Sequence, residues 1–250
     1  MTTAVASGFS WNDGPAGRML TCASLSFVPH LFTTRDVALR DLDDEQRLAL
    51  ALDVDAGHLL RVRQVHGCGV AVVTPRVPLA PGTEADAIVS TDPGSAVAVL
   101  VADCVPILIA DRHHRVVAAI HAGWRGTAAG VVSAAVEAIR ALGVAPTDLV
   151  AAVGPSAGPC CYQVDVAVRQ RFLTGQPRAG AWFVEDGPAH WKLDLWRANV
   201  DQLVDAGIPD AAVFNARLCT IDHPDVCFSY RRDGAGTGRM AAAIRLPSVR

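Results

Sequence analysis

The sequence predicts an α+β sandwich, and three observations support this. Apolar segments typical of strands and amphipathic segments typical of helices occur in comparable numbers, without the strict alternation of a doubly wound parallel sheet. The 250 residues are 51% hydrophobic and 19% charged, which provides for a full core and excludes disorder. No linker interrupts the chain, so we expect a single domain over residues 1–250.

Few elements are expected before the middle of the chain. We expect residues 1–20 to be loosely ordered and residues 31–35 to form a strand that ends in Arg35. Asp43 is expected to cap a helix that reaches about Leu52. Polar and apolar side chains alternate over residues 61–66, which indicates a strand with His66 at its end.

The stretch of residues 96–130 places polar groups at the margins of very apolar sequence. Strands are expected over residues 96–101, 107–110 and 116–121. Proline cannot donate a hydrogen bond to a strand ladder, so Pro106 puts Asp103 and Cys104 at a strand end or bulge. His121 ends the third strand. An unpaired buried polar group costs a few kcal/mol, so partners or ligands must satisfy these side chains.

The elements after this stretch are mostly helical. Thr127 is expected to cap a helix that Gly143 ends, directly after a Gly-rich turn. A strand is expected over residues 149–153 and a helix over 164–172. Asp194 caps a helix to about residue 205, and an apolar strand runs to Leu246.

Composition restricts the possible partners and the compartment. A net charge of −3 gives no electrostatic reason to expect nucleic acid, and the longest apolar run, about residues 94–110, is too short and too polar to span a membrane. The N-terminus shows no secretion signal, and seven cysteines, an odd number, argue for reduced thiols. We therefore expect a cytoplasmic, monomeric protein that acts on small molecules.

Three residues at the ends of expected strands form a possible metal site. A catalytic zinc takes three protein ligands from Cys and His and leaves a fourth position open, and His66, Cys104 and His121 could supply such a set. Alternatively, Cys104 is a nucleophile with His121 as its base, or all three are core residues. Copper oxidase chemistry needs many clustered imidazoles, and eight histidines in total are too few for a multicopper centre.

Arginine is the expected anion ligand, because Lys192 is the only lysine in the chain. Arg125 lies in a Gly-Trp-Arg-Gly turn ahead of a helix, where free backbone amides favour phosphate. The alternative is a surface arginine stacked on Trp124. Arg35, Arg231, Arg232 and Arg239 are weaker candidates.

Several motifs in fixed order also resemble a known family. They are Gln64-Val65-His66-Gly67, Ala102-Asp103-Cys104-Val105-Pro106, His121-Ala122-Gly123-Trp124-Arg125-Gly126, Gly154-Pro155 with Cys160-Cys161-Tyr162, Cys219-Thr220, and Phe228-Ser229-Tyr230-Arg231-Arg232 with Gly238-Arg239. Together they resemble the YfiH/laccase-domain family of purine nucleoside phosphorylases, from about Phe32 to Leu246.

This resemblance implies a four-layer α/β/β/α fold and a zinc ion bound by His66, Cys104 and His121. It implies phosphorolysis of adenosine, inosine and methylthioadenosine, with purine nucleoside and phosphate as substrates, and possible adenosine deamination. On this basis Asp103 would orient a histidine ligand or carry protons, and Arg125 and Arg35 would hold the anion. The family's older label is a copper polyphenol oxidase, so copper is a second possible metal.

Two further implications bear on the substrate. The family's fold is likened to that of cysteine hydrolases, which leaves open the interpretation that Cys104 and His121 are a catalytic pair of a hydrolase. Some members of the family are linked to peptidoglycan-precursor editing. Family members usually carry a Gly-Gly-Val-Ser-type loop and an Asn-Leu-Gly segment after the Thr-Thr-Arg strand. Here Arg35 runs almost directly into a helix, so a loop near the expected site is shortened.

Overall fold

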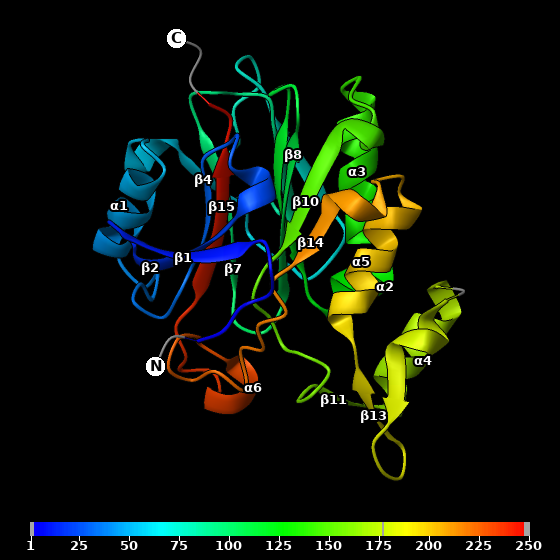
Figure 1. Cartoon of the computed structure of the whole chain (residues 1–250). Coiled ribbons are helices and arrows are strands. Elements are labelled where there is room, and N and C mark those ends of the chain that lie inside the picture. Colours follow the sequence, from blue (N-terminus) through cyan, green and yellow to red (C-terminus); the bar gives the residue numbers. More distant parts are fainter. Residues whose placement is uncertain (1–2, 177, 248–250) are drawn as a thin grey trace.

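The computed structural model describes residues 3–176 and 178–247, and it shows four layers (Figure 1). Helix α1 (Leu42–Ala51) covers the outer face of one six-stranded sheet. Helices α3 (Val131–Ala141) and α5 (Leu195–Asp205) cover the outer face of a second six-stranded sheet. The two sheets pack face to face, which confirms the predicted four-layer α/β/β/α sandwich.

Both large sheets are mixed. The first has the order β1 (Phe9–Gly14), β2 (Gly17–Cys22), β3 (His30–Thr33), β15 (Met240–Arg245), β7 (Ala96–Val101) and β4 (Leu59–Arg61). The second has the order β14 (Val213–Asn215), β10 (Leu149–Val153), β8 (Val105–Asp111), β9 (Val117–Ala122), β6 (Ala87–Ser90) and β5 (Val70–Val73). A small third sheet contains β11 (Gln163–Asp165), β13 (His190–Leu193) and β12 (Phe183–Glu185).

The central strands are apolar without alternation because both of their faces are buried. On β8, Leu108 packs between the two sheets, whereas Ile107 and Ile109 face the helical layer of α3 and α5. All three side chains are fully buried. These strands hold the polar residues at their ends in fixed positions.

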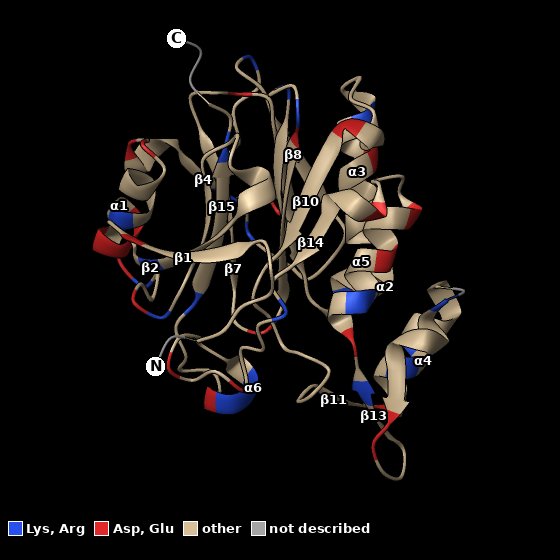
Figure 2. Cartoon of the chain, in the orientation of Figure 1, with Lys and Arg blue, Asp and Glu red and all other residues tan. Residues whose placement is uncertain are grey.

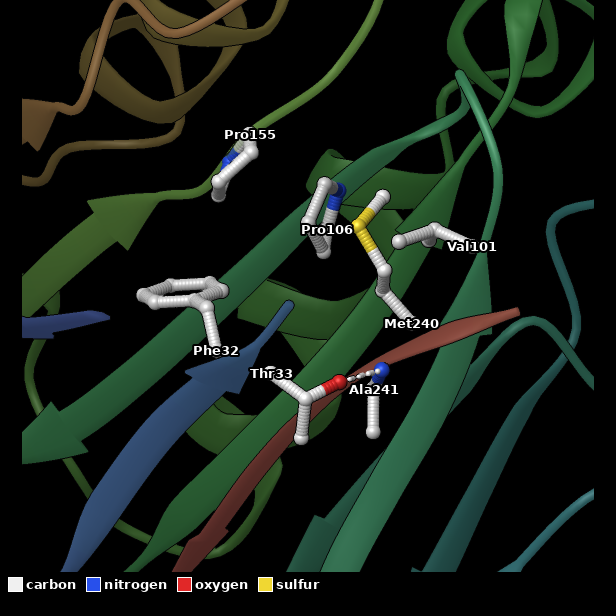
Figure 3. A pocket seen from close by; sticks show the side chains of 7 residues that line it. All are labelled: Phe32, Thr33, Val101, Pro106, Pro155, Met240 and Ala241. Carbon is white, nitrogen blue, oxygen red and sulfur yellow. Dashed lines mark hydrogen bonds between the residues drawn. The ribbon is translucent and has the colours of Figure 1, made fainter. Parts of the chain in front are cut away.

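A tight seam joins the sheets near the carbonyl end of β10 (Figure 3). Phe32, Pro106, Pro155 and Met240 line it and leave no room for a water molecule. A Cβ atom on Gly154 would lie 2.3 Å from the Phe32 ring, so only glycine allows this packing.

Charge lies mainly on the outer helices and the loops, while β10 and β14 carry none (Figure 2). Among the described residues, no helix combines the length and the apolar character that crossing a membrane requires.

The expectation of a loosely ordered segment over residues 1–20 is wrong for most of its length. Residues 9–22 form the antiparallel hairpin of β1 and β2, which adds two strands to the first sheet. Phe9 and Leu20 belong to the core between the sheets, and Gly17 takes a positive φ of 74° at the turn. Burial of these apolar side chains orders the segment.

The expected strand over residues 61–66 ends early, at Arg61. Beyond it the side chain of Gln64 pairs with Leu100 instead, accepting from its N–H and donating to its carbonyl oxygen at 2.8 Å each. The side-chain amide of Gln64 thus takes the place of a backbone partner for Leu100 on β7, and the main chain at residue 64 leaves the sheet. His66 consequently lies in a loop rather than at a strand end.

Two helix starts also differ from expectation. Asp41, not Asp43, caps α1 by accepting a hydrogen bond from the Asp44 amide. The helix expected at Thr127 begins earlier, as α2 (Trp124–Ala129) with Gly123 at its N-cap, and Gly130 in a left-handed conformation separates it from α3. Two further α-helices of the described residues are α4 (Val166–Gly175) and α6 (Tyr230–Asp233).

Candidate metal centre and its cavity

The structure brings His66, Cys104 and His121 together. Their potential ligand atoms all lie within 4.8 Å of one another, although the three residues come from the loop after β4, the turn before β8 and the end of β9. The two imidazole rings meet edge to face, with centroids 4.8 Å apart. His121 is buried, Cys104 is half-buried and His66 is exposed, so the group opens towards solvent on one side.

Asp86 fixes both histidines, and our sequence analysis assigned it no role. Its fully buried carboxylate accepts a hydrogen bond from Nδ1 of His121 at 2.8 Å. The same carboxylate accepts from the backbone amides of Val65, His66 and Gly67. A carboxylate in an otherwise apolar run, immediately before β6, was the available signal in the sequence.

The bond to Asp86 also selects the free nitrogen of His121. With Nδ1 engaged, Nε2 is the atom left to face Cys104. Histidine ligands of metals commonly donate their other N–H to a carboxylate, which fixes the ring and its tautomer. His66 is held differently, by its backbone, which adopts a positive φ of 60°.

Two glycines leave the space that this group needs. A Cβ atom on Gly123 would lie 2.8 Å from Sγ of Cys104 and 3.4 Å from the His66 ring. A Cβ atom on Gly126 would lie 2.9 Å from the carbonyl oxygen of Gly67. The glycines that flank Trp124 and Arg125 therefore allow the start of α2 to pack against both ligand loops.

The electrostatics favour a thiolate next to an imidazolium. Burial raises the pKa of the Cys104 thiol, but hydrogen bonds and charge from His121 and His66 outweigh burial and lower this pKa to about 6. Burial lowers the pKa of His121, but the bonds to Asp86 and Cys104 raise it to about 9. Burial likewise raises the pKa of Asp86, whereas His121 and the Gly67 amide bring it below its usual value.

Asp103 lies in the same turn as Cys104 but does not orient a histidine. Its carboxylate accepts from the Thr220 hydroxyl and from the Arg231 backbone amide, both at 2.6 Å. Its carbonyl oxygen accepts from Ala157. Asp103, at a positive φ of 87°, thus ties three distant segments together beside the candidate metal ligands.

The three candidate ligands form part of the wall of a cavity of about 690 Å³. Its lining combines apolar, aromatic and cationic side chains: Val62, Gln64, His66, Leu100, Ala102, Asp103, Cys104, His121, Trp124, Arg125, Tyr162, Leu195, Tyr230, Arg231 and Arg239. This size and this mixture suit a small organic molecule that carries a polar or anionic group.

The predicted anion ligands divide between two places. Arg125 lines the cavity, and its guanidinium carbon lies 4.4 Å from the centroid of the Trp124 ring. Arg35 lies outside the lining, where it donates to the Pro224 carbonyl and stacks on Phe228. Arg231 and Arg239, weaker candidates from sequence, do line the cavity. Arg231 also stacks on Tyr162, 5.0 Å from its ring centroid.

Comparison with known proteins identifies the family. A protein-family model described as multi-copper polyphenol oxidoreductase laccase matches residues 31–247, and the chain belongs to this laccase-domain family. Structurally it is similar to the hypothetical protein YfiH of Bacillus licheniformis. That similarity has a TM-score of 0.86 at 28% identity and covers 94% of this chain and 98% of the other.

Two curated relatives are named purine nucleoside phosphorylase. The chain is 39% identical over 240 residues to the purine nucleoside phosphorylase of Deinococcus radiodurans, covering 88% of this chain and 90% of the relative. It is 38% identical over 165 residues to the purine nucleoside phosphorylase of Bacteroides thetaiotaomicron. That match covers 64% of this chain and 60% of the relative, less than two thirds of the relative's length.

The role of Asp86 predicts the effect of its substitution. Asp86→Asn preserves the shape but removes the negative charge and one acceptor, so zinc affinity should fall about 10- to 100-fold. Competition with a chromogenic chelator measures this, and circular dichroism checks the fold. Asp92→Asn, in the turn before β7, is the matched control and should bind zinc normally. Equal affinities of the two variants would contradict the assignment.

The low pKa of Cys104 predicts its reactivity in metal-free protein. The thiolate forms above this pKa, so alkylation of Cys104 should be half-maximal near pH 6 and should decline below it. Mass spectrometry of the alkylated peptide follows the rate. His66→Gln should move the midpoint upward, and added zinc should suppress the labelling. A midpoint near that of an ordinary thiol, about 8.5, would refute the thiolate.

Proposed function

We propose that the protein is a zinc-dependent enzyme that cleaves purine nucleosides with phosphate. The main support for this proposal is that His66, Cys104 and His121 lie together in the wall of a cavity that arginine and aromatic side chains also line. The names of the relatives supply the reaction class, purine nucleoside phosphorolysis. Adenosine, inosine and methylthioadenosine are the proposed substrates, and deamination of adenosine is the proposed second reaction.

The chemistry of the donor set fits zinc. Two imidazoles and one thiolate, with a fourth side open to the cavity, are the ligand type and number of a catalytic zinc site. When bound there, zinc supplies Lewis-acid activation of an oxygen nucleophile. The buried Asp86 holds His121 in the orientation required, and the glycine at position 123 keeps the space next to Cys104 clear.

The remaining walls suit the two substrates. Arg125, Arg231 and Arg239 offer guanidinium groups for phosphate, whose geometry arginine matches with paired N–H donors. Trp124 and Tyr162 offer aromatic faces for a purine. Arg231 is positioned through its backbone bond to Asp103, so we assign Asp103 a positioning role rather than proton transfer. Arg35 is not part of this proposal because it lies outside the cavity.

A cysteine hydrolase is the second candidate, and a specific observation favours it. Asp86, His121 and Cys104 form a carboxylate–imidazole–thiolate series, and the depressed pKa of Cys104 is the one expected of a nucleophile. Metal content separates the candidates, because a sulfur bound to zinc is not free to attack a substrate.

Multicopper oxidase chemistry, which the family description suggests, is not part of the proposal. Within residues 3–176 and 178–247, His66 and His121 are the only histidines found in a potential metal-binding group. Multicopper centres need more clustered imidazoles than this. A cytoplasmic location and a monomeric state remain predictions from the sequence.

Metal analysis and turnover test the main proposal together. Purified protein should contain about one zinc at this site, and adenosine with phosphate should yield adenine and ribose 1-phosphate. His66→Ala and Cys104→Ala should lose that zinc and at least about 100-fold in kcat/KM, the size expected for loss of a major catalytic group. Inosine formed without phosphate would reveal deamination. Activity that survives zinc removal but not thiol alkylation would instead establish the cysteine hydrolase.

The positions of two arginines give a matched pair of variants. Arg125→Met removes a guanidinium from the cavity and should raise KM for phosphate about tenfold or more, since a charge-assisted hydrogen bond contributes about 1.5–3 kcal/mol. Arg35→Met removes one outside it and should leave this KM unchanged. Steady-state kinetics at varied phosphate measures both. The reverse order of effects would show that the anion binds elsewhere.

A further inference from the structure

A second sulfur cluster lies outside the candidate zinc centre. Cys160, Cys161 and Cys219 bring their Sγ atoms within 4.8 Å of one another, and the first two are 3.0 Å apart. Cys219 is buried, Cys161 is half-buried and Cys160 is exposed. The cluster therefore has a buried side at Cys219 and a solvent-accessible side at Cys160, from which a small ion can enter.

Backbone pairing, together with one hydrogen bond to a thiol, holds the two cysteine segments close to each other. Ser156 pairs with Cys219 in an isolated parallel bridge, with hydrogen bonds from Ser156 to Leu218 and from Thr220 to Ser156. The Gly158 amide donates to Sγ of Cys219 at 3.3 Å. A Cβ atom on Gly158 would lie 3.1 Å from Cβ of Cys219, so the glycine permits this close approach.

The pKa values of Cys160 and Cys161 shift in the opposite direction to that of Cys104. Burial and the neighbouring sulfurs raise the pKa of Cys160, and burial likewise raises the pKa of Cys161. The raised pKa of Cys160 and Cys161 lowers their thiolate fraction, which slows the thiolate attack that disulfide formation requires. Negative charge can gather here when a bound cation compensates it.

We propose that Cys160, Cys161 and Cys219 form a second metal site, which binds a soft, thiophilic cation. Three thiolates without imidazole or carboxylate select Cu(I) or Zn(II) over harder ions. On binding, three S–H bonds break, three metal–sulfur bonds form and three protons pass to solvent, with no change in oxidation state.

Metal titration of the reduced full-length protein tests this site, with Zn(II) alone in one arm and Cu(I) alone, under anaerobic conditions, in the other. We expect two bound equivalents per chain in at least one arm, and the arms identify the preferred ion. Cys104→Ser should retain one equivalent, at the thiol cluster. Cys160→Ser, a change at an exposed position that leaves the core intact, should also retain one, at the zinc centre.

Controls separate this proposal from the proposed function and from nonspecific thiol binding. Cys68→Ser alters an exposed cysteine outside both clusters and should still bind two equivalents. Co(II) substitution in Cys104→Ser should show sulfur-to-metal charge-transfer absorption that disappears when Cys219→Ser is added. Metal binding that Cys104→Ser abolishes completely, or binding by Cys160→Ser that equals that of the unchanged protein, would overturn the second site. Neither outcome depends on nucleoside turnover.

Discussion

The buried carboxylate of Asp86 is the interaction on which the candidate metal centre depends. It accepts from the His121 ring and from three successive amides of the His66 loop, so a single side chain fixes two ligands that lie far apart in sequence. Removing one partner of a buried, hydrogen-bonded charge pair costs about 3–5 kcal/mol. The carboxylate is therefore both a structural anchor of the His66 loop and, together with Cys104, a group that raises the pKa of His121.

The core explains how polar chemistry fits at the edge of such apolar sequence. Strands β7, β8 and β9 are buried on both faces, so their side chains leave little freedom to the residues that follow them. Cys104 and His121 are therefore held in fixed positions by these strands. Gly123 and Gly126 allow α2 to pack directly against the loops that carry Cys104 and His66. The cavity then acquires its cationic side from Arg125 and from the distant segment that carries Arg231 and Arg239.

Local patterns indicated an α+β sandwich and a possible ligand set, and the family resemblance added the four layers, but neither indicated what positions the candidate ligands. Strand and helix periodicity indicated the α+β fold. The positions of Cys104 and His121 near strand ends were also predicted correctly, because a strand end is indicated by the few residues around it. The hairpin of residues 9–22 was missed because its order comes from packing in the inter-sheet core. The role of Asp86 and the exclusion of Arg35 from the cavity arise from contacts between residues many positions apart, which a single sequence does not display.

The place of β15 in the first sheet determines when the site can first exist. This strand lies between β3 and β7, and the segment just before it supplies the Arg231 amide that binds Asp103 across 128 positions of sequence. During synthesis on the ribosome, the first sheet stays divided and the Cys104 turn lacks this anchor until residues 231–245 have left the exit tunnel. A nascent chain should therefore acquire the geometry of the candidate metal centre only after this segment has joined the first sheet.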